Sequence, residues 1–208
     1  MEETEIYDVN TSEELLAKLR SYTVVPDDDN IRYKQKIKET LLNCPELLYA
    51  LDGGATANLF DEDGNIVEDG WDEYFGMRNL IRPCLTFPDV QTEKKAYVTY
   101  DTSFTEEPRY NKVDKYALIT FRICVYHEFN IEPTTGIARH DLIGSIIRER
   151  FNWSNIFGRQ CKLVSDKPGA SDTNYVTRTL TFQVVSTNGI YQTDKNGVTS
   201  TINYRLRK

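Results

Sequence analysis

The side chains that could carry out general acid–base or nucleophilic catalysis are few in this sequence. There are two histidines, His127 and His140, and no serine lies in the G-x-S-x-G setting that exposes a nucleophile. Asp141 follows His140, but adjacent helix residues project about a third of a turn apart, so this pair is expected to form a polar helix start. Acidic residues are numerous, yet no spacing marks a glycosidase-type or nuclease-type carboxylate pair. We therefore predict no catalytic residue and no enzyme activity.

Oxygen ligands suitable for a metal ion gather in one segment. Residues 61–65, Asp-Glu-Asp-Gly-Asn, together with Glu68 and Asp69, supply carboxylates of the kind that calcium prefers. The EF-hand spacing fails because the glycine comes two positions early and the bidentate glutamate at the loop end is absent. A solvated hairpin turning at Asp63-Gly64 accounts for the same residues. No phosphate-binding glycine loop is present either, so we expect no metal and no cofactor.

The composition indicates an acidic globular protein. Of the 208 residues, 39% are hydrophobic and 27% charged, and the formal charge is −7. A nucleic-acid-binding face needs clustered Lys and Arg, and beyond the short basic end Tyr204–Lys208 no such run occurs, so specific DNA or RNA binding is not expected. No apolar stretch approaches the roughly 20 residues that cross a bilayer, so no membrane partner is expected.

The cysteine pattern points to a reducing compartment. Residues Met1–Glu5 lack the basic start and apolar core of a signal peptide. The four cysteines are widely scattered and form no CxxC pair, so we expect reduced, buried thiols. They are Cys44, Cys84, Cys124 and Cys161.

Helical patterns precede the strands. Thr11-x-x-Glu14 is a capping box ahead of a helix whose three leucines share one face. In a second helix, apolar residues recur every four residues from Tyr33 to Leu41. A short third helix is predicted from Pro45 to Leu51, and a fourth over residues 72–81. The three leucines of the first helix are Leu15, Leu16 and Leu19.

From Lys95 onward the pattern changes to the two-residue period of strands. A helix over residues 138–151 separates the strands, with an apolar stripe toward the sheet and a polar face that includes Arg139 and Arg148. In the strand that begins at Asn174, Arg178 interrupts an otherwise apolar face. The predicted strands are residues 96–100, 115–129, 162–164, 174–185 and 201–206.

These elements predict an α+β fold with a small antiparallel or mixed β-sheet, helices packed on one face, and a preceding N-terminal helical segment. Alternating apolar and polar residues favour antiparallel strands over buried parallel ones, which would be continuously apolar. We assign residues 1–54 to the N-terminal helical segment and residues 55–208 to the α+β domain, within one continuous domain overall.

The segment Thr135–Ile143, with the sequence Thr-Gly-Ile-Ala-Arg-His-Asp-Leu-Ile, directly follows the long alternating strand. Phe151-Asn152 and then Leu163-Val164-Ser165 come after it. This arrangement resembles the central motif of the head–tail joining and tail-terminator proteins of tailed bacteriophages, in which an Arg-x-Asp-Leu-Ile helix start crosses a small antiparallel sheet. The resemblance covers residues 80–208, whereas the helices of residues 12–51 match only in general character.

The resemblance implies a structural protein of the virion neck or upper tail, assembled in the host cytoplasm. It implies a homo-oligomeric ring, hexameric in tail terminators, that contacts the tail tube protein and the neck or connector proteins and lets DNA pass through an acidic lumen. Because closed rings use heterologous interfaces, each subunit needs two different complementary surfaces. Residues 102–111 and 166–173 are predicted polar connecting arms. The candidate subunit-interface residues are Arg139, Asp141, Arg148, Arg109 and Tyr110.

Alternatives remain open at this point. Asp141 can cap the helix start and pair with Arg139 inside one chain, or Arg139 can reach a neighbouring subunit. The protein can also be another virion structural subunit, such as a tail tube, neck adaptor or baseplate protein. A third alternative is a metal-dependent enzyme that uses residues 61–69.

Overall fold

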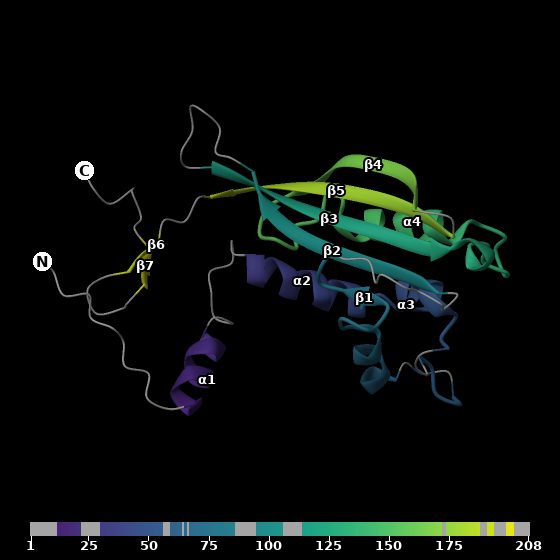
Figure 1. Cartoon of the computed structure of the whole chain (residues 1–208), viewed down its shortest axis with the longest axis horizontal. Helices are drawn as coiled ribbons and strands as arrows, with labels where there is room; N and C mark the ends of the chain where they lie inside the picture. The colour runs from purple at the N-terminus through teal and green to yellow at the C-terminus, as the bar shows by residue number, and fades with distance from the viewer. Residues whose placement is uncertain are drawn as a thin grey trace, which may run out of the picture.

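The computed structural model describes residues 12–21, 30–55, 59–63, 65, 67–85, 95–105, 114–171, 174–187, 191–193 and 199–201. The body of the protein is a five-stranded sheet with helices packed against one face (Figure 1). The α+β fold predicted from the sequence is therefore confirmed, including the helical segment near the N-terminus.

The sheet has the strand order β1-β2-β3-β5-β4 and is mixed. Its central strands pair antiparallel, while the two-residue strand β1 lies parallel to β2. The register places Phe121 of β3 opposite both Tyr100 of β2 and Leu180 of β5, so alternating residues of three strands form one apolar layer. The strands are β1 (Ile81–Arg82), β2 (Ala96–Phe104), β3 (Asp114–Tyr126), β4 (Cys161–Ser171) and β5 (Tyr175–Thr187).

Three helices cover the apolar face of the sheet: α2 (Asn30–Leu42), α3 (Pro45–Asp52) and α4 (Arg139–Phe151). The four-residue spacing of Tyr33, Ile37 and Leu41 puts all three on one side of α2, where they are buried. Pro45 suits the first turn of α3, which needs no amide hydrogen bond there. Gly53 ends α3 in the left-handed conformation, with φ of 69°.

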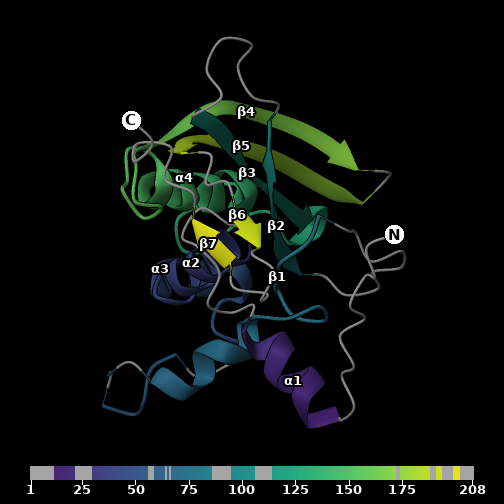
Figure 2. The ribbon, with the colours of Figure 1, turned by 90° about the vertical axis from the view of Figure 1, so that its left-hand side faces the viewer.

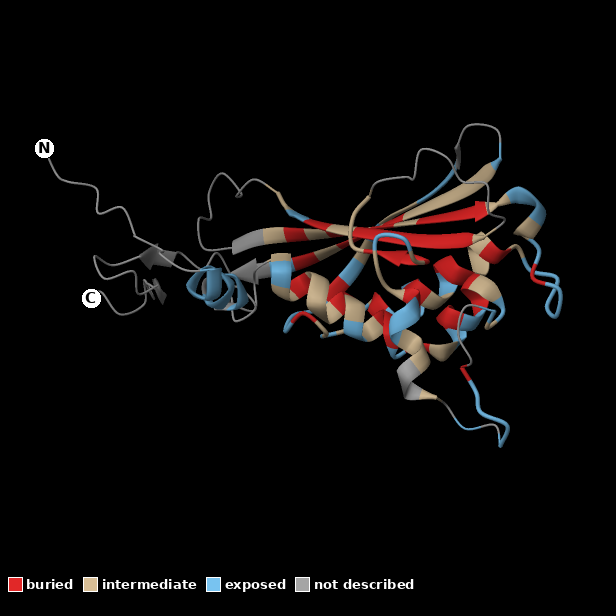
Figure 3. Ribbon diagram, turned by 60° about the horizontal axis from the view of Figure 1, so that its bottom comes forward, coloured by how far each residue is buried: buried red, intermediate tan, exposed pale blue. Residues whose placement is uncertain are grey.

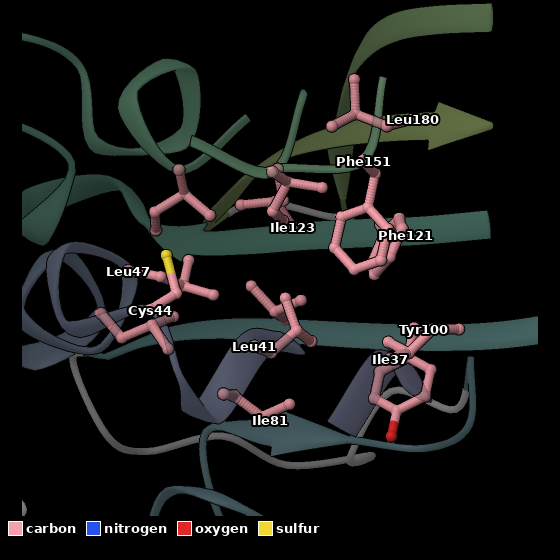
Figure 4. Packing of buried hydrophobic residues seen from close by; sticks show 14 of the residues in the cluster. Ile37, Leu41, Cys44, Leu47, Ile81, Tyr100, Phe121, Ile123, Phe151 and Leu180 are labelled. Atoms are coloured by element: carbon pink, nitrogen blue, oxygen red, sulfur yellow. The ribbon is translucent and has the colours of Figure 1, made fainter. Parts of the chain in front are cut away.

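Side chains of the helices and the sheet form a single hydrophobic core (Figure 4). Phe121 lies at its centre, with its ring centroid 4.9 Å from that of Phe151 in α4 and 5.7 Å from that of Phe182 in β5. Ile37 and Leu47, from α2 and α3, belong to the same cluster. Helices α2 and α3, which precede the sheet in sequence, therefore share its core.

Helix α1 (Ser12–Ser21) differs from the other helices because its described side chains are all exposed (Figure 3). Leu15 and Leu16 are each 49% exposed, and Leu19 is 62% exposed. Thr11, the first residue of the predicted capping box, lies outside the described residues.

Two predicted elements are wrong. Residues 72–81 do not form an α-helix: Glu68–Tyr74 is a 3-10 helix (η2), and Gly76, with φ of 144°, adopts a conformation incompatible with a helix before β1 begins. Strand β4 continues to Ser171, so most of the arm predicted at 166–173 belongs to the sheet. A bulge between Leu163 and Ser165 shifts the register, and this break in alternation conceals the second half of the strand from sequence analysis.

Two further predictions, the arm at residues 102–111 and the last strand at residues 201–206, lie only partly within the described residues. Residues 102–104 of the other predicted arm belong to β2, and residues 106–111 lie outside the described residues. Near the C-terminus, β6 (Tyr191–Thr193) pairs antiparallel with β7 (Thr199–Thr201). The predicted last strand starts at residue 201, and its residues 202–206 lie outside the described part of the chain.

Candidate subunit interface

Arg139, the first residue of α4, is buried, with 3% of its surface exposed. Its predicted position on the polar face of the helix is therefore wrong. The Nε atom donates a hydrogen bond to the Phe129 carbonyl (3.0 Å), Nη1 donates to the Ala50 carbonyl (2.6 Å), and the guanidinium lies 4.0 Å from the centroid of the Phe129 ring. Burial lowers the pKa of Arg139, but an arginine starts so high that it stays charged at neutral pH.

The acceptor in α3 explains why an arginine is favourable at this position. The last four carbonyls of a helix have no partner within it, and Ala50 lies in the last turn of α3. A cation at a helix C-terminus satisfies such a carbonyl and interacts favourably with the helix dipole. Arg139 therefore joins the end of α3 to the start of α4.

Asp141, the second candidate residue on α4, contacts β5 instead of Arg139. Its carboxylate forms an ion pair with Arg178 Nη1 and lies 3.3 Å from His140 Nε2. Arg178 in turn donates from Nε and Nη2 to the two carboxylate oxygens of Asp166 in β4, at 2.8 and 2.7 Å. Hydrogen bonding to Asp166 raises the pKa of Arg178. One arginine thus ties α4, β5 and β4 together.

Gly144 leaves the space that the Arg178 side chain occupies. A Cβ atom built on Gly144 would lie 2.9 Å from Cδ of Arg178, which is too close for an unshifted side chain. The register pairs Arg178 with Ile123 on one side and Pro168 on the other, on the face that the helices cover. The arginine that interrupts the apolar pattern of the strand is therefore the residue that fastens the helix to it.

The turn before α4 is held by the carboxylate of Glu132. Glu132 accepts hydrogen bonds from the Thr134 and Thr135 amides, at 3.1 and 2.6 Å, and from the Thr135 hydroxyl at 2.7 Å. These hydrogen bonds, led by that of the Thr135 side chain, lower the pKa of Glu132 to about 2. His140 Nδ1 lies 2.8 Å from Asn130 Oδ1, which also orients the start of α4.

The remaining candidate interface residues divide into two groups. Arg148 is exposed on α4 and is accessible to another molecule. Arg109 and Tyr110 lie outside the described residues. The contacts of Arg139 and Asp141 attach the start of α4 to α3 and β5, and their place in a subunit interface stays a prediction.

In the acidic hairpin, the carboxylate of Asp61 accepts hydrogen bonds from the hairpin itself. Asp61 Oδ1 accepts hydrogen bonds from the amides of Asp63 and Asn65, at 3.0 and 2.7 Å, and Oδ2 accepts from Asn65 Nδ2 at 3.2 Å. The backbone of the predicted hairpin closes through the Val67 amide and the Leu59 carbonyl at 3.0 Å. Among the described residues, no three His, Cys, Asp or Glu side chains come together as metal ligands.

Three cysteines lie in the core. Burial raises the pKa of Cys44 to about 11 and the pKa values of Cys124 and Cys161 to about 12, so these thiols are neutral and poorly nucleophilic. Cys84 is partly exposed, and its sulfur lies 3.7 Å from that of Met77. Among the helices of the described chain, none is both long and apolar enough to cross a membrane.

Trp153 is a surface residue that sequence analysis overlooked. It follows α4 by two positions, is 59% exposed, and is the one non-glycine residue with positive φ (63°) among the described residues. Lys162 Nζ lies 5.0 Å from the centroid of its ring. The available signal was a large aromatic residue inside the polar stretch Asn152–Asn155, where no apolar pattern accounts for it.

The sequence model of the YomW family matches residues 44–184, which is more than half of the chain. The YomW family is phage-derived and Bacillus prophage-like, and the match therefore indicates a phage-related protein. The chain belongs to the YomW family. The matched region includes α3, α4 and the strands β1 to β4, whereas α1 and α2 precede it. Comparison with curated proteins found no match.

Proposed function

We propose that this protein is a structural virion subunit at the head–tail interface of a tailed phage. In this proposal it forms a homo-oligomeric ring, with six members expected, that terminates the tail tube or joins it to the neck. Membership of a phage-derived family supports a place in the phage particle. The resemblance of the Arg139–Ile143 segment to the corresponding motif of tail-terminator proteins supports the particular place.

The observation that carries the proposal is the division between buried charges and exposed apolar side chains. Arg139 and Arg178 join elements of the body to one another, through hydrogen bonds to the Ala50 carbonyl and to the Asp166 carboxylate. Large apolar side chains are exposed at several places on the described surface, among them Leu19 in α1 and Trp153 after α4. A ring subunit needs two such surfaces of different shape, because each copy contacts one neighbour on each side.

The charge of the chain suits passage of DNA without binding. A formal charge of −7 repels the phosphate backbone on average, and a polymer that passes through a negatively charged opening is not retained by it. Specific DNA recognition plays no part in the proposed function, because a base-reading protein needs a clustered basic surface.

Immunogold electron microscopy of phage particles that carry this protein tests its place in the virion. We expect the label at the junction of head and tail. Label along the tail shaft would instead identify a tube subunit, and label at the distal tip a baseplate subunit; either result would contradict the proposal. Negative-stain images of the purified protein distinguish the same alternatives, because a terminator forms single rings, whereas a tube subunit forms open filaments.

A further inference from the structure

Trp153 is held outward by a turn with an uncommon backbone conformation. Bulky L-residues rarely adopt positive φ, so the surrounding contacts must impose it. The Trp153 amide donates to the Cys161 carbonyl at 2.7 Å, and the Ser154 hydroxyl donates to the Phe151 carbonyl at 2.8 Å. Asn152 Oδ1 accepts a hydrogen bond from the Leu163 amide at 2.9 Å, which fixes the turn to β4. The indole is therefore presented on a rigid support.

Trp153 and two exposed side chains near the start of strand β4 make up what we call the Trp153 patch: Trp153, Lys162 and Val164. The ammonium of Lys162 lies over the indole, and Val164, 52% exposed, is at the bulge of the same strand. Tryptophan is enriched among the residues that dominate binding energy at protein interfaces. A bulge, a lysine and Pro168 also make this edge of the sheet a poor template for strand pairing, so side chains are its means of recognition.

Helix α1 carries a complementary surface. Leu15 and Leu19 are one turn apart, and Leu16 is beside them, so the three leucines form one exposed apolar stripe. Glu13, in the first turn of the same helix, is exposed and acidic. The stripe matches the indole and Val164 in polarity, and Glu13 is opposite in charge to Lys162.

Helix α1 and strand β4, which carries Lys162 and Val164 of the patch, lie on opposite sides of one copy. Figures 1 and 2 share their vertical direction, and in both α1 is at the bottom and β4 at the top, with α2 and α3 between them. In this arrangement a copy does not cover its own Trp153 patch with its own α1. Two different surfaces on opposite sides are the requirement for a head-to-tail contact that closes into a ring.

We propose that α1 of one copy docks on the Trp153 patch of the next copy, with its leucines against the indole and Val164 and Glu13 near Lys162. This inference rests on the proposed ring and names the contact that closes it. A helix of ten residues is about 15 Å long, which is small for a stable interface on its own. Assembly is therefore concentration-dependent, and closure of the ring adds strength because each copy makes the contact twice.

Two variants of the full-length protein test this contact by sedimentation velocity over a range of concentrations. Leu19→Asp places a charge in the α1 stripe, and Trp153→Gly removes the indole while introducing the residue that best tolerates φ of 63°. We expect each variant to require a concentration about tenfold higher or more for assembly, as for a residue that dominates an interface. Met77→Asp is the matched control, because Met77 and Leu19 are both 62% exposed; it should assemble like the wild type.

Mixing the two variants gives the sharper result. The Leu19→Asp copy keeps an intact Trp153 patch, and the Trp153→Gly copy keeps an intact α1, so one functional contact forms between them. We expect two-copy complexes in the mixture and no rings, whereas each variant alone remains a single copy at the same concentration. Thermal melting of each variant shows whether its body is folded.

Failure of the α1 contact can be distinguished from failure of the proposed function. If both variants form rings at the wild-type concentration, the α1 contact is wrong while the ring proposal stands. If the folded variants do not form rings alone and do not form two-copy complexes when mixed, the two surfaces do not bind each other and the inference is wrong. A wild type that stays a single copy at every concentration also overturns it, and gold labelling of particles then decides the proposed function independently.

Discussion

The two ends of α4 contrast in a way that separates stability from assembly. The helix begins with a buried arginine, and an exposed tryptophan follows two residues after its end. Arg139 is buried because Ala50 and Phe129 supply acceptors and a ring surface for its charge. Trp153 has no comparable cover among the described residues, although its backbone is firmly held. Changes at the first end should therefore weaken the fold, and changes at the second should weaken contacts between copies.

The largest expected loss of stability comes from Arg139→Ala. This change removes the donors to the Phe129 and Ala50 carbonyls and leaves a cavity beside the Phe129 ring. We expect the free energy of unfolding to fall by about 3 kcal/mol, measured by urea denaturation. Arg148→Ala, on the exposed face of the same helix, is the control and should change stability by less than about 0.5 kcal/mol. If the two variants unfolded at the same urea concentration, Arg139 would not stabilise the fold as we propose.

Arg178→Ala tests the second attachment of α4. It breaks the bidentate pair with Asp166 and the ion pair with Asp141. Because the Arg178 side chain is 24% exposed, water screens part of the effect, and we expect a loss of about 1–2 kcal/mol in the free energy of unfolding. Arg150→Ala breaks a more exposed pair with Glu46 and should cost less than about 1 kcal/mol. The assignment fails if Arg150→Ala proves the more damaging change.

Glu132 provides a smaller, pH-dependent test of the same end of the helix. Its pKa is lowered to about 2 in the folded protein, from an ordinary value near 4.5. A lowered pKa gives stability that is fully present above the ordinary value and is lost as the pH falls toward the folded value. We therefore expect Glu132→Gln to melt at a lower temperature than the wild type at pH 6, with the difference shrinking between about pH 4.5 and 2. A difference that does not depend on pH would show that the carboxylate charge is irrelevant.

Trp153→Gly should have the smallest effect on stability. Glycine removes the strain of an L-residue at positive φ, which raises the free energy of unfolding by about 1–2 kcal/mol. The greater freedom of glycine in the unfolded chain lowers it by about 0.5–1 kcal/mol. These terms nearly cancel, so we expect the melting temperature of the dilute single copy to stay within a few degrees of the wild type, about 1 kcal/mol in free energy. A loss comparable to that of Arg139→Ala would mean that the indole supports the fold.

Much of the fold followed from periodicity in the sequence. The four-residue spacing in α2, the proline and glycine that bound α3, and the alternation in β3 and β5 are local signals, and the structure contains each of these elements. The bulge at Val164 was not predictable in this way, because it inserts one residue and reverses the facing pattern of β4. The 3-10 helix before β1 was missed because the apolar pattern of residues 72–81 gave no sign of the backbone turn at Gly76.

The candidate site was less accessible to sequence analysis than the fold. Arg139 belongs to the polar side of a helical pattern, and its burial depends on a carbonyl 89 residues away in α3. The partner of Asp141 is likewise distant, since Arg178 lies 37 residues further along the chain. Such contacts are set by the tertiary arrangement. The charged pair at the helix start was singled out as a candidate subunit interface, which stays a prediction, and the partners of its members within the chain could not be read from spacing.

Native mass spectrometry of the purified protein over a range of concentrations tests the central claim most directly. We expect a single closed species, with six copies of the 24.1 kDa chain, whose population increases with protein concentration. The same species should be absent for Trp153→Gly at matched concentration. A series of masses that increases without limit would indicate an open filament. A mass of one chain at every concentration would contradict the account.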